Sequence, residues 1–206
     1  MAEPDWKLRT DKGVAETDGY DEWAPDYDSD HANFGMLLLV HFVGMFCRHV
    51  DRGAGPILDA AAGTGRLAET LMLHGYDDFV GLDASAGMLR VAEAKGLYRS
   101  LHHLSLGDPL RFESNSFGAV ASLAAMAPGL AGADSFDELI RVARPNAPIV
   151  LSLRAGHEAT TGFDQRRAAL EAEGRWRLVD ETPAFVSHPE LDPPLHYGVH
   201  VYRKTQ

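Results

Sequence analysis

The chain has 206 residues and a formal net charge of −11, with 19 Lys and Arg against 30 Asp and Glu residues. This length suits one domain with enough mass to bury a core, and a hydrophobic fraction of 45% is ordinary for a globular protein. The acidic balance argues against nucleic acid as a partner, because phosphate binding needs a concentrated positive surface.

Cysteine content and hydropathy indicate the compartment. Cys47 is the only cysteine, so no intramolecular disulfide can form, which suits a reducing environment. The N-terminus is polar and acidic, without the pattern of a signal peptide. The most apolar stretch, residues 34–47, is shorter than the roughly 20 residues of a membrane span and is interrupted by His41 and Gly44. We therefore expect a cytoplasmic protein with no membrane partner, either a monomer or a dimer.

The N-terminal region divides at about residue 18. Residues 1–18 are polar and have no apolar period, which predicts a flexible segment, and residues 19–206 are expected to form one domain. Residues 20–28 hold three large aromatic side chains and so differ from a disordered tail. A helix is predicted from about residue 30 to residue 50, and the turn residues 51–56 end it.

From residue 56 onward, short apolar runs alternate with helical patterns. Strands are predicted at 56–59, 79–83, 102–106, 117–122 and 147–153, and helices within 63–75 and at 86–95, 135–143 and 163–173. Two further strands, at 176–180 and 197–202, are joined by a Pro-rich connection, and the second has a period of two. This order predicts an α/β fold with a single doubly wound, mostly parallel seven-stranded sheet and an antiparallel last strand.

The most informative motif lies where the first of these strands gives way to a helix: Leu58-Asp59-Ala60-Ala61-Ala62-Gly63-Thr64-Gly65. Its glycines allow the backbone to approach a ligand closely, at the strand end where open α/β sheets bind ligands. With Ala68 it also satisfies the dinucleotide fingerprint, so NAD is an alternative. Asp59 favours S-adenosylmethionine, because a carboxylate repels pyrophosphate and attracts an ammonium and a sulfonium. At ~4 Å and an effective dielectric of ~20, such a charge pair is worth roughly 4 kcal/mol. Asp59 as a helix cap is the structural alternative.

Two more acidic residues follow strands at useful places. Asp83 ends the second strand, where a carboxylate can accept both ribose hydroxyls; the alternative is a plain turn. Asp108, in Gly107-Asp108-Pro109, follows the third strand and can accept from an adenine amino group, whereas an ordinary Asp-Pro turn is the other interpretation.

With these motifs, the chain resembles class I S-adenosylmethionine-dependent methyltransferases. More narrowly, it is similar to the methyltransferase-like proteins of the Williams–Beuren chromosome region and their microbial relatives. The resemblance covers about residues 19–155 and depends on the strings at 20–28, 58–65, 81–98, 107–110, 115–120 and 138–145. It implies a Rossmann-like methyltransferase fold. Ala61, Gly118 and the pair Asn146-Ala147 depart from residues that are common in the family.

The resemblance also implies roles for individual residues. The Gly-rich loop (Asp59, Ala61, Gly63, Gly65) would hold the methionine part, Asp83 the ribose, Ala84 and Met88 the two sides of adenine, and Asp108 and Pro109 its edge. Residues from Ser122 to Met126 would line the side of methyl transfer. Residues 19–50 would form an N-terminal lid and helix, with Tyr20 and Tyr27 closing over the cofactor.

The chemistry places few demands on the sequence. A sulfonium methyl is already activated, and positioning alone can supply ~7–11 kcal/mol, so the absence of a catalytic dyad does not argue against catalysis. A base is needed only for an acceptor that is protonated. His31, His157 and His196 are the candidate bases, and each can equally be a surface or core histidine. No metal site is expected.

Missing motifs narrow the acceptor. The sequence has no Asn/Asp-Pro-Pro-Tyr string and no Pro-Cys pair, which are used for amide, adenine and cytosine methylation. A small-molecule acceptor with an O or N nucleophile is therefore favoured, and a protein side chain stays open. Two alternatives remain: S-adenosylmethionine used for lyase or cyclase chemistry, and a protein that only binds it.

Overall fold

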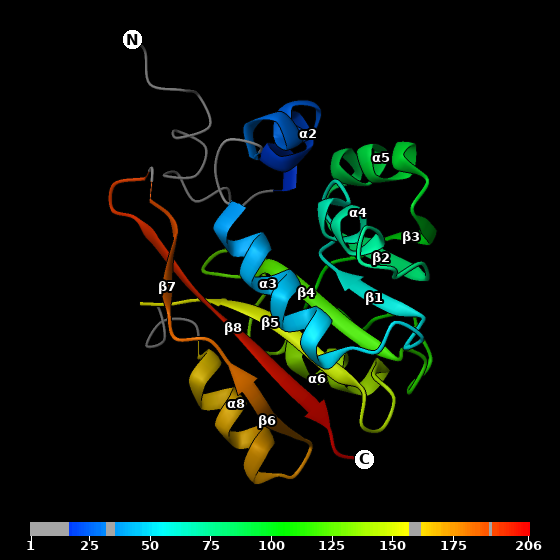
Figure 1. Ribbon diagram of the computed structural model, residues 1–206, viewed down its shortest axis with the longest axis vertical. Helices are drawn as coiled ribbons and strands as arrows, with labels where there is room; N and C mark the ends of the chain where they lie inside the picture. Colours follow the sequence, from blue (N-terminus) through cyan, green and yellow to red (C-terminus); the bar gives the residue numbers. More distant parts are fainter. Residues whose placement is uncertain (1–16, 32–35, 157–161, 190) are drawn as a thin grey trace.

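The computed structural model describes residues 17–31, 36–156, 162–189 and 191–206 (Figure 1). The first described element is the helix α2 (Thr17–His31), followed by α3 (Met36–His49). The helix predicted at about residues 30–50 corresponds to α3, which begins six residues later than expected, and the helix α2 before it was not predicted. Residues 1–16 of the expected flexible segment lie outside the described residues, while 17 and 18 begin α2.

Aromatic side chains explain why α2 forms despite Pro25 in its interior. Tyr20, Trp23, Tyr27 and His31 are spaced by three or four residues, so that they share one helix face. Their rings contact one another in sequence, with centroid distances of 6.2 Å, 4.7 Å and 3.9 Å along the series. The aromatic residues that marked this segment in the sequence thus form a continuous row along a helix.

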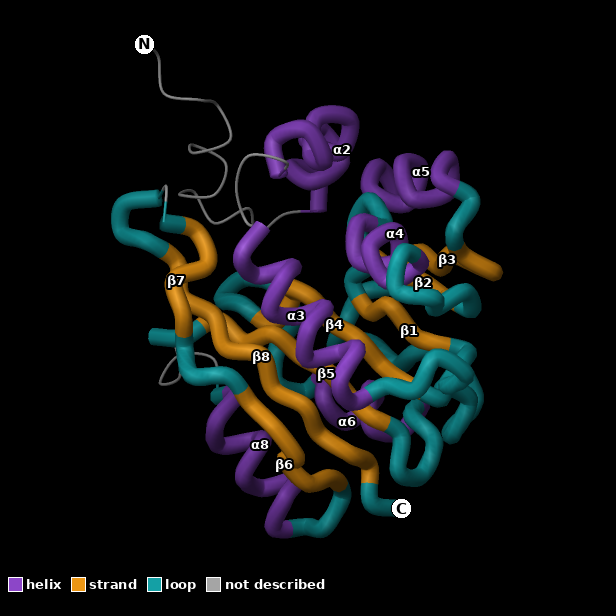
Figure 2. The backbone as a smooth tube through the Cα atoms, viewed as in Figure 1, coloured by secondary structure: helices purple, strands orange, loops and turns teal. Residues whose placement is uncertain are grey.

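A single sheet of eight strands forms the centre of the molecule (Figure 2). Its order is β3-β2-β1-β4-β5-β8-β6, and β7 pairs with β8. The parallel strands are β1 (Ile57–Ala60), β2 (Phe79–Asp83), β3 (Tyr98–His103), β4 (Ala119–Met126) and β5 (Pro148–Arg154). β8 (Leu195–Lys204) is antiparallel to β5, β6 (Trp176–Glu181) and β7 (Phe185–His188).

The mostly parallel sheet and its antiparallel last strand confirm the predicted fold class, with two corrections. The sheet has eight strands rather than seven, because the Pro-rich connection contains the short strand β7. The third strand begins at Tyr98, four residues before the predicted start. β3 is an edge strand that pairs only with β2. Its side chains are therefore polar or histidine at several positions and do not give the apolar pattern of a buried strand.

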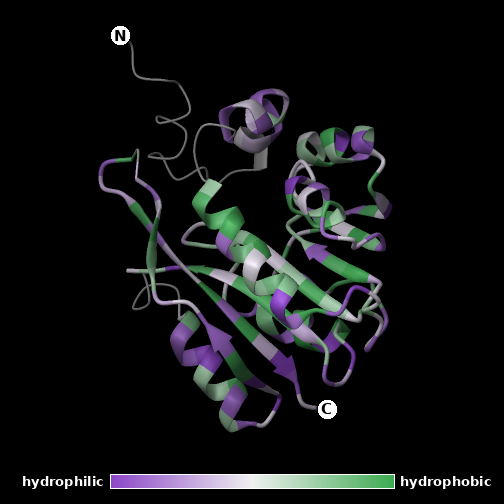
Figure 3. Ribbon diagram, in the orientation of Figure 1, coloured by the Kyte–Doolittle hydropathy of each residue, from purple (hydrophilic) through white to green (hydrophobic). Residues whose placement is uncertain are grey.

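Helices cover both faces of the sheet. α3 and α4 (Arg66–Met72) contribute to one apolar cluster, which includes Phe42, Phe46 and Leu71. α6 (Ser135–Val142) and α8 (Phe163–Ala172) contribute to the other, around Phe136 and Trp176. α5 (Ala86–Lys95) connects β2 to β3. The hydropathy colouring shows α3 as apolar along most of its length (Figure 3), although Val40 is 60% exposed.

The topology fixes where a ligand can bind. The order of the parallel strands reverses at β1, which pairs with β2 on one side and β4 on the other. Open α/β sheets bind ligands beyond the carboxyl ends of the strands at such a reversal. α2 lies at this edge (Figure 1).

No single helix within the described residues is long and apolar enough to cross a membrane. The bent pair Gly19–His31 and Met36–His49 meets that test only when both helices are counted together, by length and composition.

Candidate functional site

A cleft of about 310 Å³ opens at the carboxyl ends of the parallel strands. Its walls come from α2, the β1–α4 loop, the end of β2, the start of α5 and the end of β4. It brings together seven of the residues expected to bind the cofactor: Tyr20, Tyr27, Ala61, Gly63, Asp83, Ala84 and Met88.

Asp83 holds the centre of this cleft in shape. Its two carboxylate oxygens accept hydrogen bonds from the backbone N–H groups of Gly63 and Ser85, each at 2.8 Å. Burial raises the pKa of Asp83, while these backbone hydrogen bonds oppose that effect. Each carboxylate oxygen can accept more than one hydrogen bond, so the side chain keeps acceptor capacity for hydroxyl groups of a ligand.

Asp59 is the second carboxylate of the site, and it is only 2% exposed. Oδ2 accepts a hydrogen bond from the Tyr98 hydroxyl at 2.7 Å, whereas Oδ1 is buried without a partner among the described residues. Burial raises the pKa of Asp59 to about 7, and the Tyr98 hydrogen bond lowers it again in part. A buried acceptor without a donor is costly, so this oxygen fits a cationic ligand group.

Asp59 lines a second, smaller cavity of about 80 Å³ that adjoins the cleft. Other polar side chains of its wall are His31, Thr64, Arg66 and His188. Five residues line both cavities, and they therefore mark the place where the two meet: Tyr27, Ala61, Gly63, Leu123 and Ala124.

Two of these shared residues have strained backbones. Ala61 has φ 69° and Ala124 has φ 63°, in the left-handed region that costs a non-glycine residue roughly 1 kcal/mol. Ala124 lies in a β-bulge of β4, where the register to β5 shifts between Ser122 and Met126. Ser152 of β5 holds the bulge, because its Oγ accepts from the Ala124 N–H at 2.7 Å. Such strain gathers at functional sites.

α2 closes one side of the cleft through two acidic anchors. Asp21 accepts hydrogen bonds from the hydroxyl of Ser85 and, at 2.7 Å, from the N–H of Gly87 at the start of α5. Asp28 accepts from the Thr64 hydroxyl and forms an ion pair with Lys95 at 2.7 Å. These contacts press Tyr20 and Tyr27 into the walls of the cleft.

Four predicted cofactor residues line neither cavity. Gly65 caps the start of α4 and packs against the Tyr98 ring. Asp108 and Pro109 are exposed, because a tight turn in which the Asp108 N–H donates to Ser105 O directs them outward. Ser122 is fully buried within β4, one residue before the bulge.

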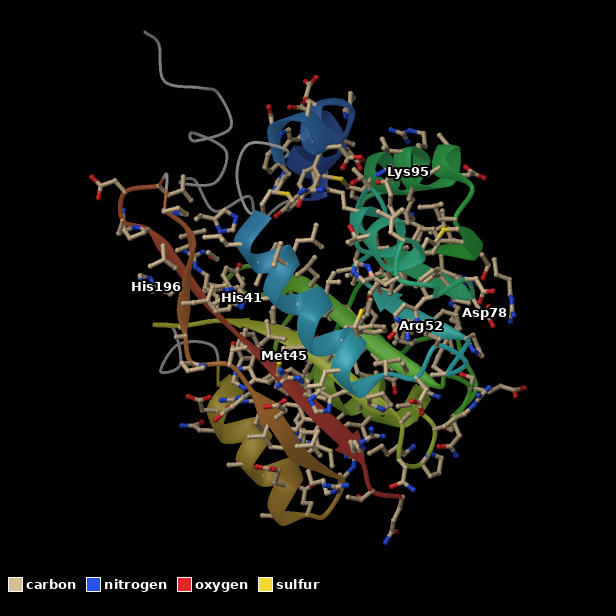
Figure 4. All side chains as sticks on the ribbon, viewed as in Figure 1. His41, Met45, Arg52, Asp78, Lys95 and His196 are labelled. Carbon is tan, nitrogen blue, oxygen red and sulfur yellow. The ribbon has the colours of Figure 1, made fainter. Side chains whose placement is uncertain are left out.

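The three candidate bases fall in different places. His31 lines the smaller cavity, and its ring stacks on Tyr27. Burial lowers the pKa of His31 to about 3, so its imidazole is neutral. His196 is exposed beside β7, on the side of the sheet away from α5 (Figure 4). His157 lies outside the described residues.

Sequence reasoning missed several residues of the walls. In the cleft they include Ser85, Leu104–Leu106 and Gly129–Ala131, and in the smaller cavity Arg66 and His188, whereas Leu123–Ala125 belong to the stretch expected to line the side of methyl transfer. Position relative to a strand end could have found Ser85 and Leu104. Nothing in the sequence marks the bulge at Ala124 or the approach of His188. Among the described residues, no group of three His, Cys, Asp or Glu side chains could hold a metal ion.

The part of the chain that forms most of both cavities matches a known protein family. A family model described as a methyltransferase domain matches residues 57–146. This stretch is a methyltransferase domain. It contains the β1–α4 loop, Asp59, Asp83 and the bulge of β4, so that the residues of both cavities come mainly from the part of the chain that defines the family. The resemblance read from the sequence is confirmed.

A human relative extends the match beyond this domain. Methyltransferase-like protein 27 from Homo sapiens is 35% identical over 158 residues, which are 74% of this chain. They are 62% of the relative, so the chain spans less than two thirds of that protein's length.

Solved structures share the fold of this chain over most of its length. One is a chain from the complex between the Haloferax volcanii Trm112 methyltransferase activator and a methyltransferase, with a TM-score of 0.66, 17% identity, and coverage of 91% of this chain and 98% of that one. Another is an S-adenosylmethionine-dependent methyltransferase from Thermotoga maritima, with a TM-score of 0.65, 11% identity and the same coverage. Two further structures with this fold, at 15% and 17% identity, are described as S-adenosylmethionine-dependent methyltransferases.

Proposed function

We propose that this protein transfers a methyl group from S-adenosylmethionine to a small-molecule acceptor with an O or N nucleophile. The observation that carries the proposal is the pair of carboxylates at the ends of adjacent strands, on either side of the Gly63 loop. Asp83 faces the cleft with spare acceptor capacity, and Asp59 keeps one buried oxygen without a donor. This pair suits a ligand with ribose hydroxyls at one end and an ammonium group at the other.

The residues present fit the two ends of this cofactor. Asp83 would accept from the ribose, while Ala84 and Met88 would contact the base in the larger cavity. Asp59 would bind the ammonium, and Arg66, in the same smaller cavity, would suit the carboxylate. A pyrophosphate would instead meet Asp59 and Asp83, whose like charges disfavour it.

The bound cofactor supplies a methyl group that is already activated on a sulfonium. The chain therefore has to orient the acceptor and exclude water. Tyr27, Leu123 and Ala124 form a mostly apolar constriction between the two cavities, where the middle of a ligand spanning both would lie. His31, neutral through burial, can accept a proton there but is a weak base.

The enclosed walls support a small acceptor. α2 covers one side of the cleft, and the side chains at the constriction are an aromatic ring, a leucine and an alanine. A protein side chain would have to pass α2, and a nucleic acid would meet a chain of formal charge −11.

Isothermal calorimetry with S-adenosylmethionine, S-adenosylhomocysteine and NAD tests the cofactor. We expect both adenosyl compounds to bind and NAD to fail. Asp83→Ala should weaken adenosyl binding by about 1.5–3 kcal/mol, as for loss of hydrogen bonds to a charged group. Binding of NAD alone, or unchanged affinity in Asp83→Ala, would contradict the proposed site.

Incubation with a labelled methyl donor and a pool of small metabolites tests the reaction. We expect a labelled small molecule together with S-adenosylhomocysteine. Formation of methylthioadenosine would indicate lyase-type chemistry instead, and labelled protein without labelled metabolite would move the acceptor class to side chains.

A further inference from the structure

Tyr98 crosses a neighbouring strand to reach Asp59. Tyr98 lies in β3 and Asp59 in β1, with β2 between them. Gly81 of β2 is the register partner of Asp59, and a Cβ at Gly81 would lie 2.9 Å from Tyr98 Cε1. The missing side chain at Gly81 therefore leaves the space through which the phenol passes. Its hydroxyl ends 2.7 Å from Asp59 Oδ2.

Neighbouring residues hold the ring of Tyr98 in place between β3 and Asp59. Phe79 contacts it edge to face with a centroid distance of 6.2 Å. A Cβ at Gly65 would lie 3.1 Å from Tyr98 Cε2, so the ring supports the turn at the start of α4 from below. Contacts with Phe79 and Gly81 of β2 and with Gly65 before α4 thus fix the direction in which the hydroxyl points, and a ring turned away from Asp59 would collide with these residues.

We propose that Tyr98 is a positioning residue that holds Asp59 in its charged form and directs the free oxygen of that carboxylate toward the cofactor's ammonium group. The inference rests on the proposed function. Tyr98 lines neither cavity, so it acts through Asp59 and not by touching the ligand. With Oδ2 occupied by the phenol, Oδ1 is the oxygen left to pair with a cation.

The ionisable surroundings of Asp59 determine the expected pH dependence. Groups that interact with it or share its cavity are Tyr98 of β3, Asp83 of β2, Tyr27 and His31 of α2, Arg66 of α4 and His188 of β7. Burial raises the pKa of Asp59, the Asp83 charge adds to that rise, and the Tyr98 hydroxyl opposes both. Removing the hydroxyl therefore favours the protonated, uncharged carboxyl at neutral pH.

Tyr98→Phe isolates the hydroxyl, because the ring contacts with Gly65, Gly81 and Phe79 remain. Tyr76→Phe is the matched control. The Tyr76 hydroxyl is also buried and donates at 2.7 Å, but to the Val50 carbonyl outside both cavities. The first measurement is the affinity for S-adenosylhomocysteine by calorimetry from pH 5.5 to 9. The cofactor's own groups titrate identically in every variant, so differences between the curves report the protein.

In the wild-type protein we expect affinity to fall as pH drops through the titration of Asp59. Tyr98→Phe should move this midpoint upward by about one to two pH units, the equivalent of one hydrogen bond to a charged group. Its affinity should approach the wild-type value as the pH rises toward 9, and Tyr76→Phe should reproduce the wild-type curve. A Tyr98→Phe curve that superimposes on the wild-type curve, or lies below it equally at every pH, would overturn the inference.

The second measurement needs no ligand. Carbon-13 NMR of the Asp carboxyl groups follows the titration of Asp59 in the free protein, with Asp59→Asn to assign its signal. Tyr98→Phe should raise the Asp59 midpoint, and an unchanged midpoint would overturn the inference. If the wild-type protein binds no adenosyl compound, the proposed function is refuted. A higher Asp59 midpoint in Tyr98→Phe than in wild type would still support the coupling of Tyr98 to Asp59.

Discussion

Asp59 and Asp83 were predicted from the sequence because each lies at the end of a buried strand and a glycine turn follows Asp59, and both signals can be read from consecutive residues. The environment that gives Asp59 its chemistry cannot be read from consecutive residues. Its hydrogen-bond partner lies 39 residues further along the chain and reaches it through a gap at Gly81 that only the strand register reveals. Asp108 is the opposite case, because a local turn directs a well-placed acid into solvent.

The raised pKa of Asp59 predicts a pH-dependent cost in stability. A carboxyl whose folded pKa is about 7 instead of the ordinary 3.8 favours folding while protonated, and this contribution is lost as pH rises from about 4 through 7. Asp59→Asn cannot ionise. Between pH 5 and pH 8 it should therefore gain about 2–3 kcal/mol in unfolding free energy relative to wild type. Urea unfolding of both proteins at the two pH values measures this. An equal difference at both would show that Asp59 stays charged throughout.

At the scale of elements, α2 shows how contacts with the rest of the fold can stabilise a helix that its own sequence disfavours. Pro25 disfavours a helix interior, but the aromatic row, together with Asp21 and Asp28, gives the segment partners on the β1–α4 loop and on α5. The bulge of β4 is similar, since its hydrogen bond to Ser152 on β5 is what keeps Ala124 in a strained conformation. Neither partner could be identified before the strands were ordered.

Gly87→Ala tests the docking of α2. A Cβ at Gly87 would lie 2.7 Å from the Asp21 Cα, so α2 must move away, while α5 itself gains up to ~1 kcal/mol from alanine. Affinity for S-adenosylhomocysteine should fall by about 1–3 kcal/mol, and limited proteolysis should cut within α2 faster. Gly44→Ala on the exposed face of α3, where a Cβ meets nothing within 4 Å, should leave both readouts unchanged. Wild-type affinity in Gly87→Ala would show that α2 does not contribute to binding.

At the scale of the whole molecule, the alternation of apolar runs and helical patterns was enough to predict a mostly parallel sheet with an antiparallel last strand. The order of the strands places the reversal at β1, and the glycine motif that follows β1 therefore lies at the cleft. The short strand β7 was not predictable, because its pairing depends on β8 alone and its sequence lies among prolines.

Ligand binding should stabilise the entire domain. At a concentration of 100 times its Kd, S-adenosylhomocysteine should add about 2.7 kcal/mol to the unfolding free energy, which raises Tm by roughly 5–11 °C for a domain of this size. Differential scanning fluorimetry measures the shift, with NAD at equal concentration as the comparison. A shift produced equally by NAD would argue for a dinucleotide site.

Because Tyr27 belongs to α2 yet forms part of the constriction between the two cavities, displacement of this one helix dismantles both compartments at once. The proposed acceptor chamber is therefore complete only with α2 in this position. We therefore expect sequential, ordered kinetics, in which the methyl donor enters first, the helix closes behind it and the acceptor arrives last through a narrower opening. Turnover would then be paced by how quickly the spent donor escapes from beneath the helix.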